Sequence, residues 1–339
     1  MADWVHASPG RDGEGAGGPA ELAKKERCNV ALTLKTAIGN YGHTTPLKDG
    51  SVASDQIAME HVEVNPVIAI FRRMIRGLEF DVSEMALSTY LCARAHGKPI
   101  TAIPAFVVRG FHHGAIVYNT RSGIASPSDL EGRRVGVRGY TVTTGVWVRG
   151  ILSSVYGVNL DKVTWVLSGD EHVSEYQHPP NVVSAESDDL AAMLVAGEID
   201  AAIGAGRVDS PDVKPLIPDA RQAAVEYVQQ TGVFPINHTI VMKNEVMDAN
   251  PWLPEELFRC FKAAKESYVQ RLSAGRELDA ADQAVAEMGQ LAGGDPLPFG
   301  VEANRKTIET FVDFNIEQKV LTQKVTPEQV FAPTTLALS

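Results

Sequence analysis

The sequence predicts an α/β protein of two lobes, with mixed sheets flanked by helices and a first lobe that is discontinuous along the chain. A length of 339 residues is long for a single hydrophobic core and favours two. β-prone runs alternate with amphipathic helical patterns, which is typical of sheets covered on both faces. A late β-prone run, PINHTIVMKN at 235–244, follows the second lobe and is expected to return to the first.

Three parts of the chain follow from this pattern. Residues 1–27 are expected to form a tail rich in Gly, Ala and charge, residues 28–117 and 235–339 lobe 1, and residues 118–234 lobe 2. The tail has no apolar stretch of the kind that a signal peptide needs, and no later stretch approaches transmembrane length. We therefore expect a cytoplasmic protein that does not contact a membrane.

The charge balance limits the kinds of partner. The net charge of −11 argues against a nucleic-acid-binding protein, because no basic stripe offsets it. A small anion can still bind where arginine, histidine and main-chain N–H groups converge. The cysteines Cys28, Cys92 and Cys260 form no CxxC pair, which indicates reduced, buried thiols. The sequence leaves a homo-oligomer open.

Two segments of lobe 1 carry candidate residues. A strand is expected at 30–37, and ligands of open α/β sheets bind beyond the carboxyl ends of strands. His43 and Thr44 in the following loop are therefore candidates to hold a carboxylate or hydroxyl, although such a loop is as often only polar and solvated. Ser83 is expected to cap a helix that carries Glu84 in its first turn. A carboxylate there is a dipole partner more often than a base.

In lobe 2, the run RGYTVTT at 138–144 follows an expected strand and opens a helix. Free N–H groups and the positive end of the helix dipole favour an anion at such a position, and threonine hydroxyls add donors. The alternative is a capped helix without a ligand. A further carboxylate candidate is Arg207, which follows the expected strand AIGA. The candidate residues of the loop are Arg138, Tyr140, Thr141, Thr143 and Thr144.

Polar residues also interrupt the β-prone run where the first crossover between lobes is expected. Arg109 can hold a carboxylate in a bidentate manner, and histidines transfer protons near neutral pH. Because successive strand residues face opposite ways, Arg109 and His113 are expected on one face and His112 on the other. His238 lies at the expected return crossover, close to His113. The alternative is that these four residues are structural, bonded to the main chain or packed in the core.

The histidines His43, His112, His113, His172 and His238 are numerous enough to form a metal site. None of them occurs in an HxH or HExxH spacing, which metal-binding histidines often show. We therefore expect no metal.

Two groups of motifs carry a family resemblance. DLEGRRVGV at 129–137 and AGEIDAAIG at 196–204 resemble the type II periplasmic-binding-protein fold, in which the first lobe is discontinuous and two crossovers form a hinge. A second group resembles the 4,5-dihydroxyphthalate decarboxylases of phthalate breakdown, and the resemblance spans about 30–331. This group comprises EFDVSEMALSTY at 79–90, RGFHH at 109–113, TTGVWVRGIL at 143–152 and FPINH at 234–238.

The resemblance implies a non-oxidative decarboxylase without a cofactor that converts 4,5-dihydroxyphthalate to protocatechuate and CO2. This small aromatic dicarboxylate needs cationic or N–H partners for its carboxylates, and the reaction needs an acid near the ring carbon that loses CO2. His113, His238 and Glu84 are the catalytic candidates. The substrate-binding candidates are His43, Thr44, Arg109, His112, Arg138, Tyr140, Thr141, Thr143, Thr144 and Arg207.

Two other functions fit the same fold. One is a non-catalytic solute-binding protein for an aromatic carboxylate, which would share the cleft but not turn the ligand over. The other is a cytoplasmic dehydratase that acts on a cyclic carboxylic acid. Incubation with 4,5-dihydroxyphthalate distinguishes the three functions, because only the decarboxylase releases CO2.

Overall fold

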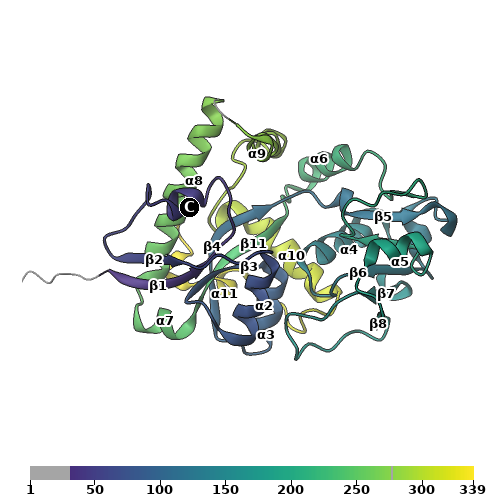
Figure 1. Cartoon of the computed structure of the whole chain (residues 1–339), viewed down its shortest axis with the longest axis horizontal. Helices are drawn as coiled ribbons and strands as arrows, with labels where there is room; N and C mark the ends of the chain where they lie inside the picture. The colour runs from purple at the N-terminus through teal and green to yellow at the C-terminus, as the bar shows by residue number, and fades with distance from the viewer. Residues whose placement is uncertain (1–30, 276–277) are drawn as a thin grey trace, which may run out of the picture.

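The structure, a computed structural model, describes residues 31–275 and 278–339. The tail expected at 1–27 lies outside the described residues, as does Cys28. Figure 1 shows two lobes side by side, each built on its own sheet with helices around it. Among the described helices, none has the length and apolarity needed to cross a membrane.

Lobe 1 contains a mixed five-stranded sheet in the order β2-β1-β3-β11-β4. β1 lies parallel to β2 and β3, whereas β11 is antiparallel to both β3 and β4. The late strand β11 therefore completes the sheet begun by the first part of the chain. The strands are β1 (Leu32–Ala37), β2 (Ile57–His61), β3 (Val82–Ala86), β4 (Ile100–Arg109) and β11 (Ile236–Lys243).

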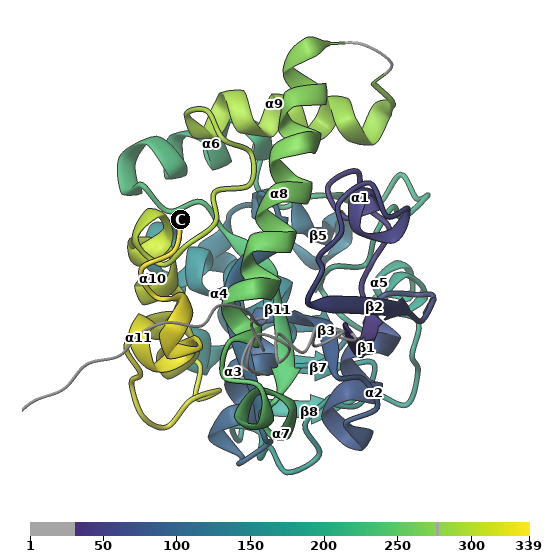
Figure 2. The same cartoon turned by 90° about the vertical axis from the view of Figure 1, so that its left-hand side faces the viewer.

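Helices cover this sheet on both sides. α2 packs on β3, α3 packs on β11, and the long helix α8 packs on β4. Figure 2 shows α8 lying across the strands of lobe 1, with α9 above it. These helices are α1 (Thr45–Lys48), α2 (Ile68–Gly77), α3 (Leu87–Ala95), α7 (Asn244–Ala249), α8 (Leu253–Ala274), α9 (Ala280–Ala292), α10 (Arg305–Glu317) and α11 (Pro327–Val330).

Lobe 2 contains a six-stranded sheet in the order β10-β5-β9-β6-β7-β8. β6 lies parallel to β7 and β9, and β5 is antiparallel to β9 and β10. The strands are β5 (Ile116–Asn119), β6 (Arg134–Val137), β7 (Thr164–Leu167), β8 (Val182–Ser184), β9 (Ala201–Ile203) and β10 (Val213–Pro215). The helices of lobe 2 are α4 (Thr143–Tyr156), α5 (Leu190–Ala196) and α6 (Ala220–Thr231). Short 3₁₀ turns complete the chain at η1 (His113–Ala115), η2 (Thr120–Ser122), η3 (Pro127–Leu130), η4 (Leu160–Lys162), η5 (Glu302–Asn304) and η6 (Pro333–Thr335).

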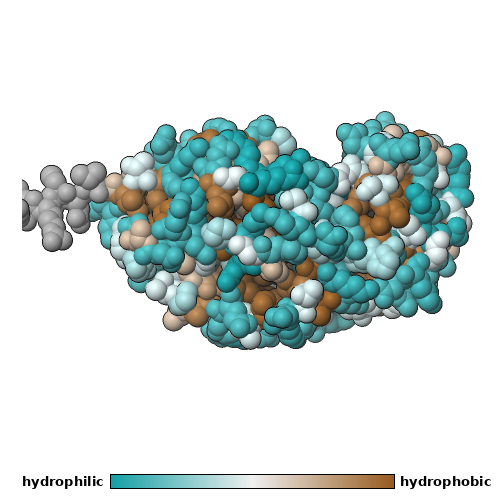
Figure 3. All heavy atoms as spheres, turned by 90° about the horizontal axis from the view of Figure 1, so that it is seen from below, coloured by the Kyte–Doolittle hydropathy of each residue, from teal (hydrophilic) through white to brown (hydrophobic). Residues whose placement is uncertain are grey.

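The two sheets meet at the ends of their strands. The crossovers at 110–115 and 232–235 run side by side, and the Gly110 N–H donates to the Pro235 carbonyl at 3.4 Å. β1, β3 and β4 end, and β11 begins, at the edge of lobe 1 that faces lobe 2. Figure 3 shows an indentation in the molecular outline between the lobes. Together with the mixed α/β sheets, this arrangement confirms the predicted two-lobed fold with a discontinuous first lobe.

One side of the junction is an apolar joint between α4 of lobe 2 and α10. The Trp147 ring stacks on Phe311 with centroids 4.6 Å apart, and its Nε1 donates to the Ile236 carbonyl at 2.9 Å. Gly150 leaves the space that the Phe314 ring fills. A continuous cluster of buried side chains therefore extends from one lobe into the other.

The expected helix cap at Ser83 is wrong. Ser83 and Glu84 lie within β3, all five residues of that strand are buried, and α3 begins only at Leu87. The reason is that β3 is central in a sheet covered on both faces, so its polar residues are enclosed together with its apolar ones. Glu84 is therefore a buried strand carboxylate.

Gly150→Ala tests the α4–α10 joint. The added Cβ meets the Phe314 ring, so we expect the free energy of unfolding to fall by about 1–3 kcal/mol, as measured by urea denaturation. Gly77→Ala at the end of α2 is the matched control, because a Cβ there has no neighbour within 4 Å. Equal stability of the two variants would contradict the joint.

Candidate active site

The centre of the candidate site is a buried carboxylate, Glu84, which is 0% exposed. Its Oε1 accepts a hydrogen bond from the Tyr41 hydroxyl at 2.8 Å and lies 2.6 Å from Nδ1 of His238. Its Oε2 accepts the Gly39 N–H at 2.7 Å. The cluster thus joins β3, the loop after β1 and the start of β11, where the sheet of lobe 1 faces lobe 2.

The hydrogen bonds keep Glu84 ionised although it is buried. Burial alone raises the pKa of Glu84. The hydrogen bond and charge of His238, together with the hydrogen bonds from Gly39 and Tyr41, outweigh this effect, so the pKa lies below its ordinary value. Because Nδ1 of His238 is turned to Glu84, Nε2 is the nitrogen left for a ligand. The carboxylate fixes the ring and serves as its counter-ion when the imidazole carries two protons.

The loop after β1 supports this cluster from behind. The Tyr41 ring stacks on His43 with centroids 5.3 Å apart, and burial lowers the pKa of His43 to about 4, so its ring is neutral at neutral pH. The Thr44 hydroxyl donates to the Gly39 carbonyl at 2.8 Å and accepts the Tyr41 N–H at 2.9 Å. Thr44 therefore shapes the loop from inside and is not free for a ligand.

The side chain of Arg109 is used by the fold. Nη1 donates to the Phe234 carbonyl at 2.8 Å, and Nη2 donates to the Pro298 carbonyl at 3.0 Å and to Asn304. Burial lowers the pKa of Arg109 to about 9, which still leaves it charged at neutral pH. The bidentate carboxylate clamp predicted for this residue is not available in the structure, because both terminal nitrogens are already engaged.

His112 contacts Asn237, the residue before His238, whereas His113 was the residue expected near His238. The charge of His238 is among the causes that lower the pKa of His112 to about 4, after burial. His112 stacks on Trp147 at 6.2 Å, and its Nε2 lies 2.8 Å from Oδ1 of Asn237. These contacts place His112 at the junction between β11 and α4.

His113 lies elsewhere in the crossover. Its ring packs on Tyr227 of α6 with centroids 5.5 Å apart, and burial lowers its pKa to about 4. Within 31–275 and 278–339, His113 has no hydrogen bond or ring contact with Glu84 or His238. Its role in proton transfer therefore stays a prediction.

The loop before α4 binds a carboxylate, as its geometry favours, but the carboxylate belongs to Glu171 of the chain itself. Glu171 accepts the N–H of Tyr140, the N–H of Thr141 at 3.1 Å and the Thr141 hydroxyl, and it lies 3.2 Å from Nε2 of His178. Burial raises the pKa of Glu171, but these hydrogen bonds outweigh it and lower the pKa. The N–H groups of Tyr140 and Thr141 are therefore occupied by Glu171, and a role of these residues toward a substrate stays a prediction.

The two threonines that open α4 differ. The Thr143 hydroxyl accepts the Ser88 N–H at 3.0 Å, which joins α4 to the start of α3 in lobe 1. Thr144 is partly exposed and its side chain has no hydrogen-bond partner in the described part of the chain. Thr144 thus remains open to a ligand.

Two arginines of lobe 2 are available for an anion. Arg138 directly follows β6, Arg207 follows β9, and these parallel strands are neighbours, so both arginines lie at one edge of the sheet. Both are exposed, and neither side chain has a hydrogen bond or ion pair with another residue of 31–275 or 278–339. They are the cations that the site offers to a carboxylate.

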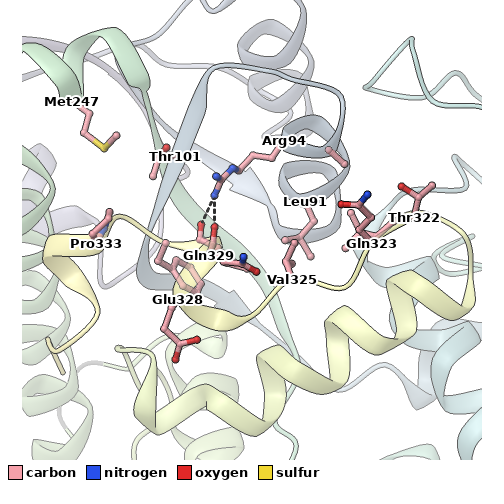
Figure 4. A pocket seen from close by; sticks show the side chains of 14 residues that line it. Leu91, Arg94, Thr101, Met247, Thr322, Gln323, Val325, Glu328, Gln329 and Pro333 are labelled. Carbon is pink, nitrogen blue, oxygen red and sulfur yellow. Dashed lines mark hydrogen bonds between the residues drawn. The ribbon is translucent and has the colours of Figure 1, made fainter.

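Two pockets lie apart from this edge. One of about 740 Å³ lies between α3 and the C-terminal segment, with Arg94 bonded to main-chain carbonyls at 329 and 330 (Figure 4), and it contains none of the predicted site residues. Another of about 490 Å³ lies between the loop after β1 and α8, and it is bordered by Tyr41, His43 and Arg109. The predicted residues are thus divided between the junction of the lobes and the rear of the Glu84 cluster.

Residues that the sequence did not single out complete the site. Tyr41 holds Glu84, Glu171 fills the α4 loop, and the Phe71 ring lies edge-on to His238 with centroids 4.9 Å apart. Tyr41 stands in the loop that the sequence favoured, whereas Phe71 and Glu171 have no local pattern that sets them apart. Among the described residues, no group of three or more His, Cys, Asp or Glu side chains is placed to hold a metal ion.

Solved structures define the class of fold. The periplasmic aliphatic sulphonate-binding protein of Escherichia coli aligns with a TM-score of 0.51 at 14% identity, covering 88% of this chain and 91% of its own. The alkanesulfonate-binding protein of Xanthomonas axonopodis pv. citri gives a TM-score of 0.52 at 12% identity, covering 88% and 98%. The fold is therefore that of the two-lobed periplasmic solute-binding proteins.

Relatives in sequence define the family within this fold. A 4,5-dihydroxyphthalate decarboxylase of Comamonas testosteroni is 32% identical over 324 residues, which is 90% of this chain and 98% of the relative. One of Pseudomonas putida is 37% identical over 182 residues, or 51% and 70%. The family model described as NMT1/THI5 like matches residues 79–178. The chain belongs to the 4,5-dihydroxyphthalate decarboxylase family, and the predicted resemblance is confirmed.

Tyr41→Phe tests the support of Glu84. A carboxylate with a lowered pKa stabilises the fold above its ordinary pKa and loses that contribution as the pH falls through the lowered value. We expect the variant to lose about 1.5–3 kcal/mol of unfolding free energy at neutral pH, and less in acid, by urea denaturation. Tyr156→Phe is the control, since its hydroxyl has no hydrogen-bond partner among the described residues. A loss independent of pH would contradict the prediction.

Proposed function

We propose that the protein is a carboxy-lyase that converts 4,5-dihydroxyphthalate to protocatechuate and CO2. The observation that carries the proposal is the Glu84–His238 pair at the edge of lobe 1, with the unpaired Arg138 and Arg207 at the facing edge of lobe 2. The names of the two relatives support the same reaction. A cytoplasmic location stays a prediction.

The geometry assigns different tasks to the two lobes. The substrate carries two adjacent carboxylates, and arginine is suited to grip each of them through parallel N–H donors. In our proposal Arg138 and Arg207 hold the carboxylates, and Thr144 adds a hydroxyl. The aromatic ring then extends toward His238, whose Nε2 is the nitrogen not taken by Glu84.

The chemical step needs one proton and no change of oxidation state. Nε2 of His238 gives its proton to the ring carbon that bears the leaving carboxylate, while the hydroxyl para to that carbon pushes electrons into the ring. The carbon–carbon bond then breaks, its electron pair restores the aromatic ring, and CO2 leaves. Each turnover consumes one proton, which solvent returns to His238.

The surroundings of His238 favour the loss of charge in this step. A carboxylate leaves as neutral CO2, so a site poor in water lowers the cost of reaching the transition state. Phe71 lies against His238, and burial keeps the rings of His43 and His112 neutral near neutral pH. Glu84 stays ionised, and it acts through His238 and not on the substrate.

His238→Asn tests the proton donor. We expect kcat to fall by about 10²–10⁴-fold, because general acid catalysis is lost while the arginines still bind the substrate. The measurement is release of CO2 and protocatechuate from 4,5-dihydroxyphthalate. His113→Asn is the comparison, and a larger fall in that variant would overturn the assignment. Tight binding by the wild-type protein without turnover would instead indicate a solute-binding protein.

Arg138→Gln and Arg207→Gln test the carboxylate partners. Each loses a charge-assisted hydrogen bond worth about 1.5–3 kcal/mol, so KM should rise by about 10- to 100-fold with a smaller change in kcat. Arg134→Gln is the matched control, because this exposed arginine begins β6 whereas Arg138 follows its end. An unchanged KM in both site variants would contradict the proposed binding mode.

A further inference from the structure

A polar contact crosses between the lobes at the loop after β7, residues 168–173. The Asp170 carboxylate is held by two arginines of α2 in lobe 1, with Arg72 Nη2 at 2.5 Å from Oδ1 and Arg76 Nη2 at 2.7 Å from Oδ2. Arg76 also donates to the carbonyls of Glu171 at 2.6 Å and His172 at 3.4 Å. We call Asp170, Arg72 and Arg76 the latch.

The latch is more than a pair of surface charges. An isolated exposed ion pair contributes little, because solvent screens it and both side chains lose freedom. Here one carboxylate takes a separate guanidinium on each oxygen, and one guanidinium also binds the main chain of the same loop. Such a network fixes the loop against α2 in one orientation, whereas a single pair would let it slide.

One aromatic ring connects the latch to His238. Phe71, which precedes Arg72 on α2, lies between two histidines: His172 of the loop at 6.0 Å and His238 at 4.9 Å between ring centroids. Nδ1 of His172 also lies 3.3 Å from the Thr89 hydroxyl of α3. The loop therefore packs against Phe71 through His172, and Phe71 packs against His238.

The same loop also borders the lobe 2 part of the site. A Cβ placed at Gly169 would lie 3.1 Å from the Arg138 carbonyl, so the loop and the start of the anion-binding segment are in close contact. Burial lowers the pKa of His172 to about 4, and the charges of Arg138, Arg72 and Arg76 lower it further. Arg72, Arg76 and Arg138 thus all lie close to this loop.

We propose that Asp170 is a positioning residue, which with Arg72 and Arg76 closes the cleft and holds Phe71 against His238. The role of this closure in turnover rests on the proposed function, whereas the closure itself does not. The latch and the apolar α4–α10 joint have different chemistry. The apolar joint persists when charges are screened, whereas the latch weakens, as do the ion pairs Lys98–Glu175 and Lys319–Asp161 that also cross between the lobes.

The experiment compares Asp170→Asn and Asp170→Glu with Glu79→Gln. Glu79 is the matched control, because it pairs with Arg73 of the same helix at 2.7 Å but lies within lobe 1. We expect Asp170→Asn to lower kcat by about two- to fivefold with little change in KM, since Asp170 does not touch the substrate. Asp170→Glu should retain activity, because its carboxylate still reaches the arginines.

Small-angle X-ray scattering of the same proteins without substrate tests the closure directly. Asp170→Asn should have a larger radius of gyration than the wild type, Glu79→Gln should not, and added salt should open the wild type. If Asp170→Asn scatters like the wild type, the latch is overturned, whatever the activity. If it opens but the wild type never decarboxylates the substrate, the proposed function fails and the latch stands. Should Asp170→Asn misfold, Arg72→Gln with Arg76→Gln breaks the same contact.

Discussion

The arrangement of the site depends on one buried charge. Glu84 lies in the centre of a sheet covered on both faces, where an ionised carboxylate is costly unless hydrogen bonds surround it. Three groups from separate segments supply those bonds, namely the Gly39 N–H, the Tyr41 hydroxyl and His238. The loop after β1, strand β3 and the returning strand β11 therefore hold one another in register. The same bonds that stabilise the carboxylate orient the histidine toward the cleft.

Arginines gather at the junction between the lobes, although the chain as a whole is acidic. The protein carries a net charge of −11, yet Arg72, Arg76 and Arg138 lie around the loop after β7, and Arg207 lies on the same sheet edge as Arg138. An acidic surface repels anions at long range, whereas converging arginines attract them close by. This contrast favours a small, doubly charged ligand, because such a ligand can enter a narrow space. It disfavours a large polyanion.

The alternation of elements and the return of the chain could be predicted from the sequence, because periodicity and β-propensity are local properties. Within the site, His238 and Glu84 were singled out, but their direct contact depends on the pairing of β11 with β3, which no local pattern records. Ser83 was misread as a cap because the residues that follow it look helical, so the strand seemed to end before it. Glu171 was missed because a carboxylate from a distant loop competes with a substrate for the same N–H groups, and only the folded chain reveals such competition.

The packing of α10 on α4 has a consequence for how the protein is made. The core of lobe 2 is enclosed in part by Phe311 and Phe314, which come more than a hundred residues after Trp147. During synthesis the ribosome therefore releases all of lobe 2 before the chain can cover the exposed flank of that helix. Until residues 305–317 emerge, this apolar flank has no cover from α10, so the joint between the lobes forms late.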